Sequence, residues 1–172
     1  AFTTIAKSKI PTIALAHGFC IGGATSLVSA CDIRLATKDA KFSIGETKLG
    51  LVADVGVIQR MPKIVSSGDM NELALTGRIF DGEHAEKIRF VSKAYGNSDE
   101  LFEAGEKLAN EISSNSKRIV QATKEALEKS SNLTVDQGLE YAKLWSTSFL
   151  VSEDLREGVM AFLEKRDPKF NE

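Results

Sequence analysis

Residues 11–24 read PTIALAHGFCIGGA, and this run carries the strongest structural signal in the chain. Residues 12–16 form a short apolar run of strand length, and the proline before them is a residue confined to the start or edge of a strand. Gly22 and Gly23 then allow a sharp bend. Small apolar residues at helical spacing follow as far as Ala30. The run therefore predicts a strand, a glycine turn and a helix.

The start of this helix is a candidate site for an oxygen that carries or develops negative charge. The first N–H groups of a helix have no acceptor within it, and the helix dipole is positive at that end. A phosphate-binding loop is excluded because no Gly-Lys-Ser/Thr follows, and the glycines do not have GxGxxG spacing. A tight turn that binds no ligand is an equal alternative on this pattern alone.

The rest of the chain has strands early and helices late. Residues 1–9 resemble the end of a helix, strands are predicted at 32–36 and 41–44, and the glycine-rich segment 45–56 cannot be one regular element. Helical patterns begin at Val57, with an interruption at Pro62 and a shorter alternating run at 90–94. Caps and spacing predict helices ending at Gly77 and covering 81–89, 98–113, 117–129, 135–149 and 153–163.

Composition limits the class of protein. The 172 residues, 42% of them hydrophobic, can bury one sizeable core. A net charge of -2 gives no electrostatic footprint for nucleic acid or an anionic membrane, and no apolar run reaches membrane-spanning length. Cys20 and Cys31 are isolated, which favours buried thiols of a reducing compartment over a disulfide or a zinc site. His17, at the end of a predicted buried strand, is expected to be a core residue.

Two carboxylates in the irregular segment are candidates for proton transfer. Glu46 and Asp54 follow predicted strands, where functional residues concentrate. They are eight positions apart, so only a loop can bring them together. In an apolar pocket one could act as acid and the other as base, while two solvated loop carboxylates are the alternative. The apolar neighbours that could form the wall are Leu49, Leu51, Val52, Val55 and Val57.

Several short runs recur in a recognisable order. They are PTIALAHG at 11–18, IGG at 21–23, ACDI at 30–33, Phe42, Glu46, LG at 49–50, QR at 59–60, LTGR at 75–78 and MAFLEKR at 160–166. Together they resemble the enoyl-CoA hydratase/isomerase, or crotonase, superfamily over nearly the whole chain. The run GLVADVG at 50–56 is most similar to the delta-3,5-delta-2,4-dienoyl-CoA isomerases, whereas hydratases tend to have a Pro-Gly-containing loop there.

The resemblance implies an α/β fold of crotonase-like (ClpP/crotonase) type. A spiral of strand–helix repeats would cover residues 1–115, and a helical region at 116–172 would serve trimerisation and cover coenzyme A. It also implies a fatty acyl-CoA substrate, a homotrimer or dimer of trimers, and a peroxisome or mitochondrion as location. No separate cofactor or metal is expected, because coenzyme A is part of the substrate. Family members carry a further N-terminal segment, so a truncated chain is expected.

The resemblance also implies roles for individual residues. The N–H of Gly23 would be one of two donors to the thioester oxygen, and Glu46 and Asp54 would move the proton between the ends of the diene. Phe162 and Lys165 match a C-terminal helix over the CoA nucleotide; a core aromatic and a solvated lysine are an equal alternative. The implied substrate-binding residues are Gly22, Ser26, Leu51, Phe162 and Lys165.

Two departures from the family pattern leave alternatives open. Ser26 stands where hydratases carry a second glutamate and dienoyl-CoA isomerases a further aspartate, which argues against water addition and leaves a single-base shift through Glu46 open. Arg89 stands where the family usually has glycine, so either the turn differs or Arg89 is strained. The predicted function is double-bond isomerisation of an unsaturated acyl-CoA in fatty acid beta-oxidation. The alternatives are an enoyl-CoA hydratase, a monoene isomerase, or a non-catalytic acyl-CoA-binding or scaffold protein.

Overall fold

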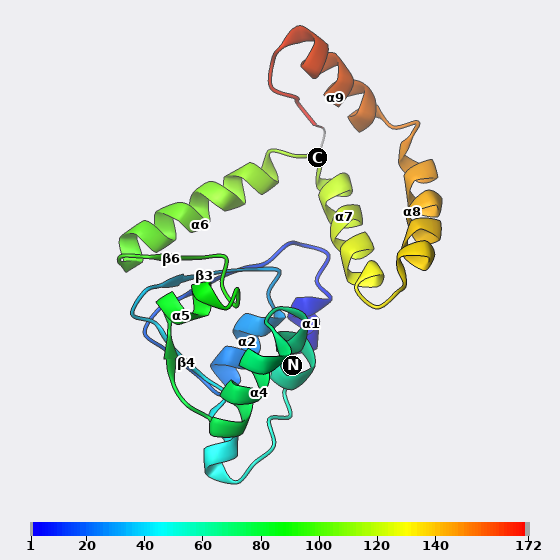
Figure 1. Cartoon of the computed structure of the whole chain (residues 1–172). Coiled ribbons are helices and arrows are strands. Elements are labelled where there is room, and N and C mark those ends of the chain that lie inside the picture. Colours follow the sequence, from blue (N-terminus) through cyan, green and yellow to red (C-terminus); the bar gives the residue numbers. More distant parts are fainter. Residues whose placement is uncertain (1, 171–172) are drawn as a thin grey trace. The chain divides into compact units, whose positions relative to one another are not determined.

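A computed structural model describes residues 2–170. The chain divides into two compact units, and the division falls inside helix α6 (Ser98–Ser113). The mixed unit consists of Thr12–Lys107 and the segment up to Ser8, and the helical unit consists of Lys9–Pro11 and the residues from Leu108 onward. Figure 1 shows strands in the mixed unit alone, with helices following along the rest of the chain. The functional division at residue 115 stays a prediction.

The mixed unit is built on two small sheets. One has the strand order β1-β3-β6 and is parallel throughout; the other has the order β2-β4-β5, with β2 parallel and β5 antiparallel to β4. Parallel neighbours need a crossover connection, and the one between β1 and β3 contains β2 and α2. The strands are β1 (Ile13–Ala16), β2 (Phe19–Ile21), β3 (Ile33–Thr37), β4 (Lys41–Ser43), β5 (Phe80–Asp81) and β6 (Lys93–Tyr95).

Helices fill the intervals between these strands and make up the rest of the chain. In the mixed unit they are α1 (Phe2–Ala6), α2 (Gly23–Ala30), the 3-10 helix η1 (Gly45–Leu49), α3 (Val57–Arg60), the 3-10 helix η2 (Met61–Lys63), α4 (Ser67–Thr76) and α5 (Gly82–Lys87). The α/β class predicted from the sequence is confirmed. Gly77 ends α4 in the left-handed conformation, as its position predicts.

Two strands were not predicted, and a third lies beside its predicted place. Phe19–Ile21 falls in the expected glycine turn, yet it pairs with β4 in register Cys20↔Phe42. A three-residue strand has too short a pattern to be recognised without its partner, and the same holds for β5. The alternating run at 90–94 pairs only from Lys93 onward, because Phe90 and Val91 are buried in the core instead.

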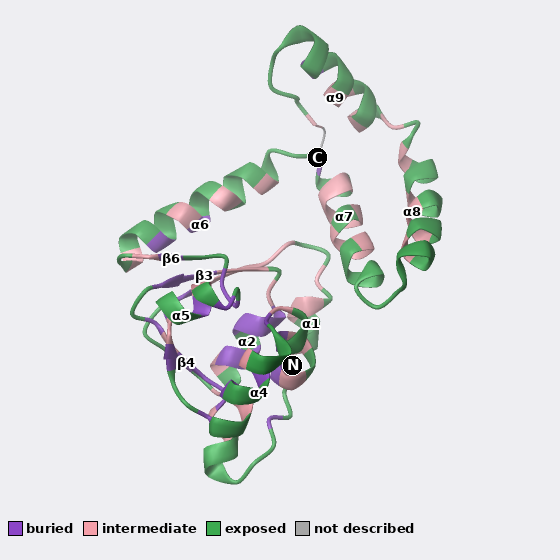
Figure 2. Cartoon of the chain, in the orientation of Figure 1, coloured by how far each residue is buried: buried purple, intermediate pink, exposed green. Residues whose placement is uncertain are grey.

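Aromatic packing marks the centre of the mixed unit. The Phe42 ring stacks on Phe80 at 5.5 Å between centroids and meets Phe90 edge-on at 5.4 Å. Phe42 and Phe90 are fully buried, and the buried residues gather around β4, β3 and α2 (Figure 2). This core fixes the end of β4, from which the candidate site begins.

Of the two outcomes expected for Arg89, a different turn or a strained backbone, the structure has the strained backbone. Its φ is 66°, a left-handed conformation just after α5 that suits glycine. Two bonds close the turn around it, from Arg89 N–H to Glu86 O and from Val91 N–H to Ala85 O. The neighbouring Arg34 reaches the same turn, where its Nε donates to Phe90 O at 2.8 Å. Burial lowers the pKa of Arg34 from its ordinary value.

The helical unit contains α7 (Lys117–Ser130), α8 (Val135–Phe149) and α9 (Glu153–Glu164). The capping box of Thr134 and Gln137 is present at the start of α8, and α7 and α8 are bonded through Tyr141 Oη and Glu125 Oε1 at 3.2 Å. Among its described residues only Ser116 and Ala161 are buried, and the others are exposed or of intermediate burial, drawn green and pink in Figure 2. None of the helices in the described part of the chain is long and apolar enough to cross a membrane.

Candidate functional site

The start of α2 is open on the side where a ligand would bind. Gly22 precedes the helix with φ 57° and ψ -115°, and no side chain caps the first turn. A Cβ on Gly23 would have no atom of the described residues within 4 Å apart from its chain neighbours and the backbone of its own helix. The first N–H groups of α2 have no acceptor within the helix, and the dipole adds positive potential there. The residue expected to be an oxyanion donor therefore lies at an accessible helix start.

Ser43 and Thr25 hold this helix start in place. The Gly22 N–H donates to Ser43 O at 2.8 Å, and the hydroxyl of the fully buried Thr25 bonds to Ser43 O at 3.0 Å and to Cys20 O. The Ser43 hydroxyl in turn donates to Gly77 O at 3.0 Å. These bonds tie α2 to β2, to β4 and to the end of α4. The sequence analysis did not identify Ser43 or Thr25 as positioning residues, because their role depends on strand β2.

Glu46 lies directly over Gly22. It follows β4 by three residues, and a Cβ on Gly22 would lie 3.4 Å from Glu46 Oε1 and 3.9 Å from Oε2. Glu46 Oε2 is buried and has no hydrogen-bond partner among the described residues. A buried carboxylate oxygen without a donor is unfavourable, so it is available to another partner. The structure thus brings together two of the predicted site residues, Gly22 and Glu46, beside Gly23.

Asp54 lies on the segment between η1 and α3 and is exposed. The buried Ala53 anchors this segment, and the Arg60 guanidinium packs on Gly56 and donates to Val55 O at 3.3 Å. Gly56 has φ 111°, and the absence of a Cβ leaves room for the guanidinium. Asp54 joins none of the contacts around Gly22. The prediction that it acts together with Glu46 stays a prediction.

The apolar side chains near Asp54 face solvent. Leu51, predicted to bind substrate, is 60% exposed, and Val52 is 80% exposed. Leu49 and Val55 are exposed as well, whereas Val57 is completely buried in the core. The segment therefore presents an apolar surface beside Asp54, as a wall for an apolar substrate would require, with Val57 as its inner support.

Ser26 lies one turn after Gly22 on α2. It is completely buried, its N–H donates to Gly22 O at 3.0 Å, and its hydroxyl has no hydrogen-bond partner among the described residues. The position at which the family resemblance implies a carboxylate thus holds a small neutral hydroxyl inside the molecule.

The remaining polar residues of the mixed unit have structural positions. Cys20 is buried, which raises the pKa of its thiol, whereas Cys31 is only partly buried. The expectation that His17 is a core residue is wrong: it is exposed, and its ring meets Phe102 edge-on at 5.8 Å. In the described residues, no group of three or more His, Cys, Asp or Glu side chains is arranged to hold a metal ion.

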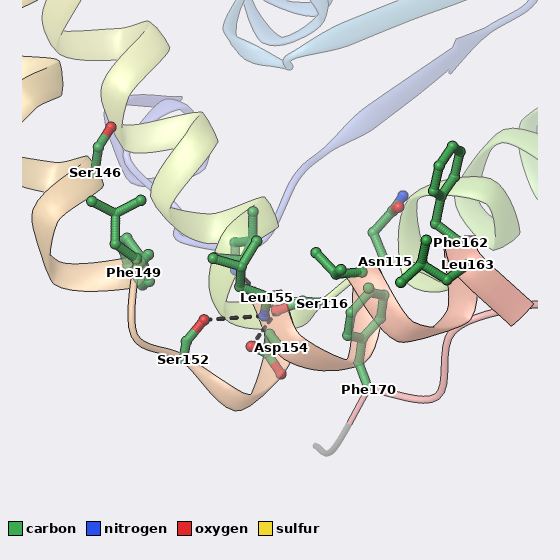
Figure 3. Close-up of a pocket in the computed structure, with 14 residues that line it drawn as sticks. Asn115, Ser116, Ser146, Phe149, Ser152, Asp154, Leu155, Phe162, Leu163 and Phe170 are labelled. Carbon is green, nitrogen blue, oxygen red and sulfur yellow. Dashed lines mark hydrogen bonds between the residues drawn. The ribbon is translucent and has the colours of Figure 1, made fainter.

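The two C-terminal site residues lie elsewhere, in the helical unit. Phe162 is 82% exposed, and it lines an apolar hollow of about 570 Å³ together with Phe149 and Phe170 (Figure 3). The Ser116 hydroxyl bonds Asp154 at 2.7 Å within this hollow. Lys165 is exposed and ends α9 with φ 55°. Phe162 is therefore not a core aromatic, and its role toward CoA stays a prediction.

Comparison with known proteins supplies the family. The sequence profile of the enoyl-CoA hydratase/isomerase family matches residues 1–172. The chain belongs to this family. Among curated family members, it is 49% identical over 96% of its length to the mitochondrial Delta(3,5)-Delta(2,4)-dienoyl-CoA isomerase of Dictyostelium discoideum. It is 44% identical over 99% of its length to the peroxisomal Delta(3,5)-Delta(2,4)-dienoyl-CoA isomerase of Arabidopsis thaliana.

Solved structures of the enoyl-CoA hydratase/isomerase family have the same fold. The enoyl-CoA hydratase of Bacillus anthracis superimposes with a TM-score of 0.92 at 29% identity, covering 98% of this chain and 65% of the other. The predicted crotonase-like fold is confirmed. The chain spans 57% of the Dictyostelium relative and 61% of the Arabidopsis relative.

Proposed function

We propose that the protein to which this chain belongs isomerises dienoyl-CoA thioesters, shifting the double bonds from positions 3 and 5 to positions 2 and 4. The observation that carries the proposal is the Glu46 carboxylate placed over Gly22 with one buried, unpartnered oxygen, beside the open N–H of Gly23. The names of the dienoyl-CoA isomerases of Dictyostelium discoideum and Arabidopsis thaliana, to which this chain is similar, support the same reaction.

The proposed reaction is a proton transfer through an enolate. Loss of a proton from the carbon next to the thioester delocalises negative charge onto the thioester oxygen. The Gly23 N–H and the dipole of α2 stabilise that charge, and one such donor contributes about 3–4 kcal/mol to a transition state. One of the carboxyl groups of Glu46 and Asp54 accepts the proton beside the thioester, while the other, protonated at the start, donates its own proton at the far end of the diene. Proton exchange with solvent then restores both groups. Redox chemistry has no part in this scheme, so no cofactor is proposed beyond the coenzyme A of the substrate.

The direct test uses full-length protein and a 3,5-dienoyl-CoA substrate. Formation of the 2,4-dienoyl product extends the conjugation of the thioester, so ultraviolet absorbance rises with turnover. Glu46→Gln is expected to lower kcat by about a hundred- to ten-thousand-fold, because a positioned proton-transfer group is lost. Glu103→Gln removes an exposed carboxylate of α6 and serves as the matched control. An unchanged rate in Glu46→Gln would refute the mechanism.

The two alternative functions, hydration and acyl-CoA binding without turnover, can be distinguished from isomerisation with the same protein preparation. An enoyl-CoA hydratase incorporates solvent oxygen into its product, which mass spectrometry in 18O-labelled water detects. A non-catalytic acyl-CoA-binding protein gives binding heat in calorimetry without turnover. The buried neutral Ser26 supports isomerisation over hydration, because no second carboxylate faces Glu46 from α2.

We propose a self-associated protein in a mitochondrion or a peroxisome. The locations come from the names of the two relatives, one mitochondrial and one peroxisomal. The helical unit supports association, since large apolar side chains of α8 and α9 such as Leu144 (74% exposed) and Phe162 are exposed in the single chain. A homotrimer or a dimer of trimers is the expected assembly. Phe162 and Lys165 are proposed to cover the CoA nucleotide in it.

A further inference from the structure

Two unpaired polar atoms are buried at the same helix start. Across the described residues, three buried side-chain oxygens lack a hydrogen-bond partner: Ser26 Oγ, Glu46 Oε2 and Thr37 Oγ1. Proteins seldom leave such atoms unpaired, and an ordered internal water usually supplies the missing bonds. Thr37 lies on β3, whereas Ser26 and Glu46 both lie against the first turn of α2. One partner could therefore satisfy both of the latter.

Ser26 and Glu46 both lie next to Gly22, the residue that precedes α2. Ser26 lies four residues after Gly22 and is bonded to it through the backbone at 3.0 Å. Side chains on a helix tilt toward its N-terminus, so the Ser26 side chain is directed toward Gly22, the residue that precedes α2. The Glu46 carboxylate covers Gly22, with its oxygens 3.4 and 3.9 Å from the place of a Cβ. The Ser26 hydroxyl and the Glu46 carboxylate therefore both adjoin Gly22, and a water that joins two such groups makes a hydrogen bond of about 2.8 Å to each.

We propose that one buried water bridges Ser26 Oγ and Glu46 Oε2, and that Ser26 is thereby a positioning residue for the Glu46 carboxylate. The water donates one hydrogen to Glu46 Oε2 and bonds the Ser26 hydroxyl. The bridge restricts rotation of the carboxylate, which keeps the other oxygen, Oε1, directed at the space beside Gly22 and Gly23. The bridge itself is independent of the reaction. Its effect on turnover rests on the proposed isomerase function.

The sign of a stability change tests the bridge. A buried hydroxyl without a hydrogen-bond partner destabilises the folded state. Ser26→Ala would therefore raise the Tm of the full-length protein if Ser26 Oγ were truly unpaired. With the bridge, Ser26→Ala removes a hydrogen-bonded group and lowers the Tm. Thr37→Val is the matched control, since it removes the other unpartnered hydroxyl of the described residues, which lies on β3. A Tm increase in Ser26→Ala, equal to that of Thr37→Val, would overturn the proposal.

A double-mutant cycle separates the bridge from an independent effect of Ser26. Glu46→Met keeps the length of the side chain and removes the acceptor of the water. Ser26→Ala is expected to lower the Tm in the wild-type background and to raise it in the Glu46→Met background, where the Ser26 hydroxyl is left without the bridge. Equal shifts in both backgrounds would show that Ser26 and Glu46 share no partner, which would overturn the bridge.

Kinetics test the positioning role. Ser26→Ala is expected to lower kcat with 3,5-dienoyl-CoA by about 10- to 100-fold while KM is unchanged, because the base is misplaced and the substrate contacts are kept. Ser26→Cys, a weaker donor of similar shape, should give an intermediate kcat. If wild-type protein turns over and Ser26→Ala matches it, the positioning role is refuted. If wild-type protein does not turn over, the proposed function fails, while the stability cycle still decides the bridge.

Discussion

Arg89 is the clearest case of a single residue in an unfavourable backbone conformation. Its φ of 66° places a β-carbon where glycine is preferred, which costs about 1–2 kcal/mol for an ordinary residue. We predict that Arg89→Gly raises the free energy of unfolding by about 0.5–1 kcal/mol, since the added flexibility of glycine in the unfolded chain offsets part of the gain. Urea unfolding followed by circular dichroism measures the difference.

Arg89→Ala is the control for that prediction. It removes the same exposed side chain and keeps the β-carbon, so it should not stabilise the protein. If alanine and glycine raised the stability equally, the cause would lie in the arginine side chain, and the backbone explanation would be wrong.

At the residue scale, the sequence predicts which chemical groups matter better than where they lie. Gly22, Gly23 and Glu46 are identified from the glycine turn, the resemblance and the residue types, and the structure places them together. The packing of Glu46 over Gly22 depends on the register Cys20↔Phe42, a tertiary contact that no local pattern contains. The exposure of His17 was missed for a similar reason, because burial of a strand end depends on which elements cover it.

At the scale of elements, long periodic helices with caps are predicted within a residue or two. Ser116, Thr134 and Ser152 each accept a bond from the N–H three residues on, as capping requires. The short strands β2 and β5 were missed, since two or three residues carry no periodicity of their own. Their pairing with β4 is decided by the core around Phe42.

Thr25 connects three elements, and its removal should loosen the start of α2. We predict that Thr25→Val, which keeps the shape and removes the hydroxyl, lowers the free energy of unfolding by about 1–3 kcal/mol, because buried carbonyl groups lose their donor. Chemical denaturation measures the loss. Thr76→Val, at an exposed hydroxyl bonded within α4, is the control and should change stability by much less. Equal losses would remove the special role given to Thr25.

The end of α9 is predicted to respond to acid. Arg166 binds both carboxylate oxygens of Glu157, at 2.6 and 3.0 Å, and the Lys169 N–H adds a bond at 2.7 Å. The hydrogen bonds from Arg166, then that from Lys169, lower the pKa of Glu157 to about 2 from 4.5. Because the folded pKa is depressed, this stabilisation is present above about pH 4.5 and is lost as pH falls toward 2.

Thermal unfolding at several pH values checks the acid response. The Tm difference between wild-type protein and Glu157→Gln is expected to be largest at pH 5 and above and to shrink steadily down to about pH 2. Arg166→Met should remove the same pH-dependent part of the Tm, because it removes the main hydrogen-bond donor to the Glu157 carboxylate. A Tm difference that stays constant between pH 5 and 2 would contradict the assignment to Glu157.

At the scale of the whole molecule, the two units differ in how they are stabilised. The mixed unit buries an aromatic core, whereas the described part of the helical unit buries only Ser116 and Ala161. Helices that keep large apolar side chains exposed gain stability when another surface covers them. We predict that the Tm of full-length protein rises with protein concentration, as binding between copies stabilises the folded state.

Leu144 offers a substitution that separates association from folding. Leu144→Glu on α8 should reduce association, measured by sedimentation, and remove the concentration dependence of the Tm. Leu144→Met keeps an apolar side chain of similar volume and should behave as the wild type. Monomeric wild-type protein with a Tm independent of concentration would refute the prediction.

The pairing of β3 with β6 has a consequence for synthesis on the ribosome. Leu35 pairs with Lys93, so the candidate site residues Glu46 and Asp54 lie inside the stretch of chain that this pairing closes, while β1 and β3 enclose only β2 and α2. In the nascent polypeptide, β1 can therefore pair with β3 early in synthesis. The sheet is complete only after Tyr95 has left the exit tunnel, because β6 is its last strand. Until then the segment with Glu46 and Asp54 is not enclosed by the β3–β6 pairing, so proteases and chaperones can bind it.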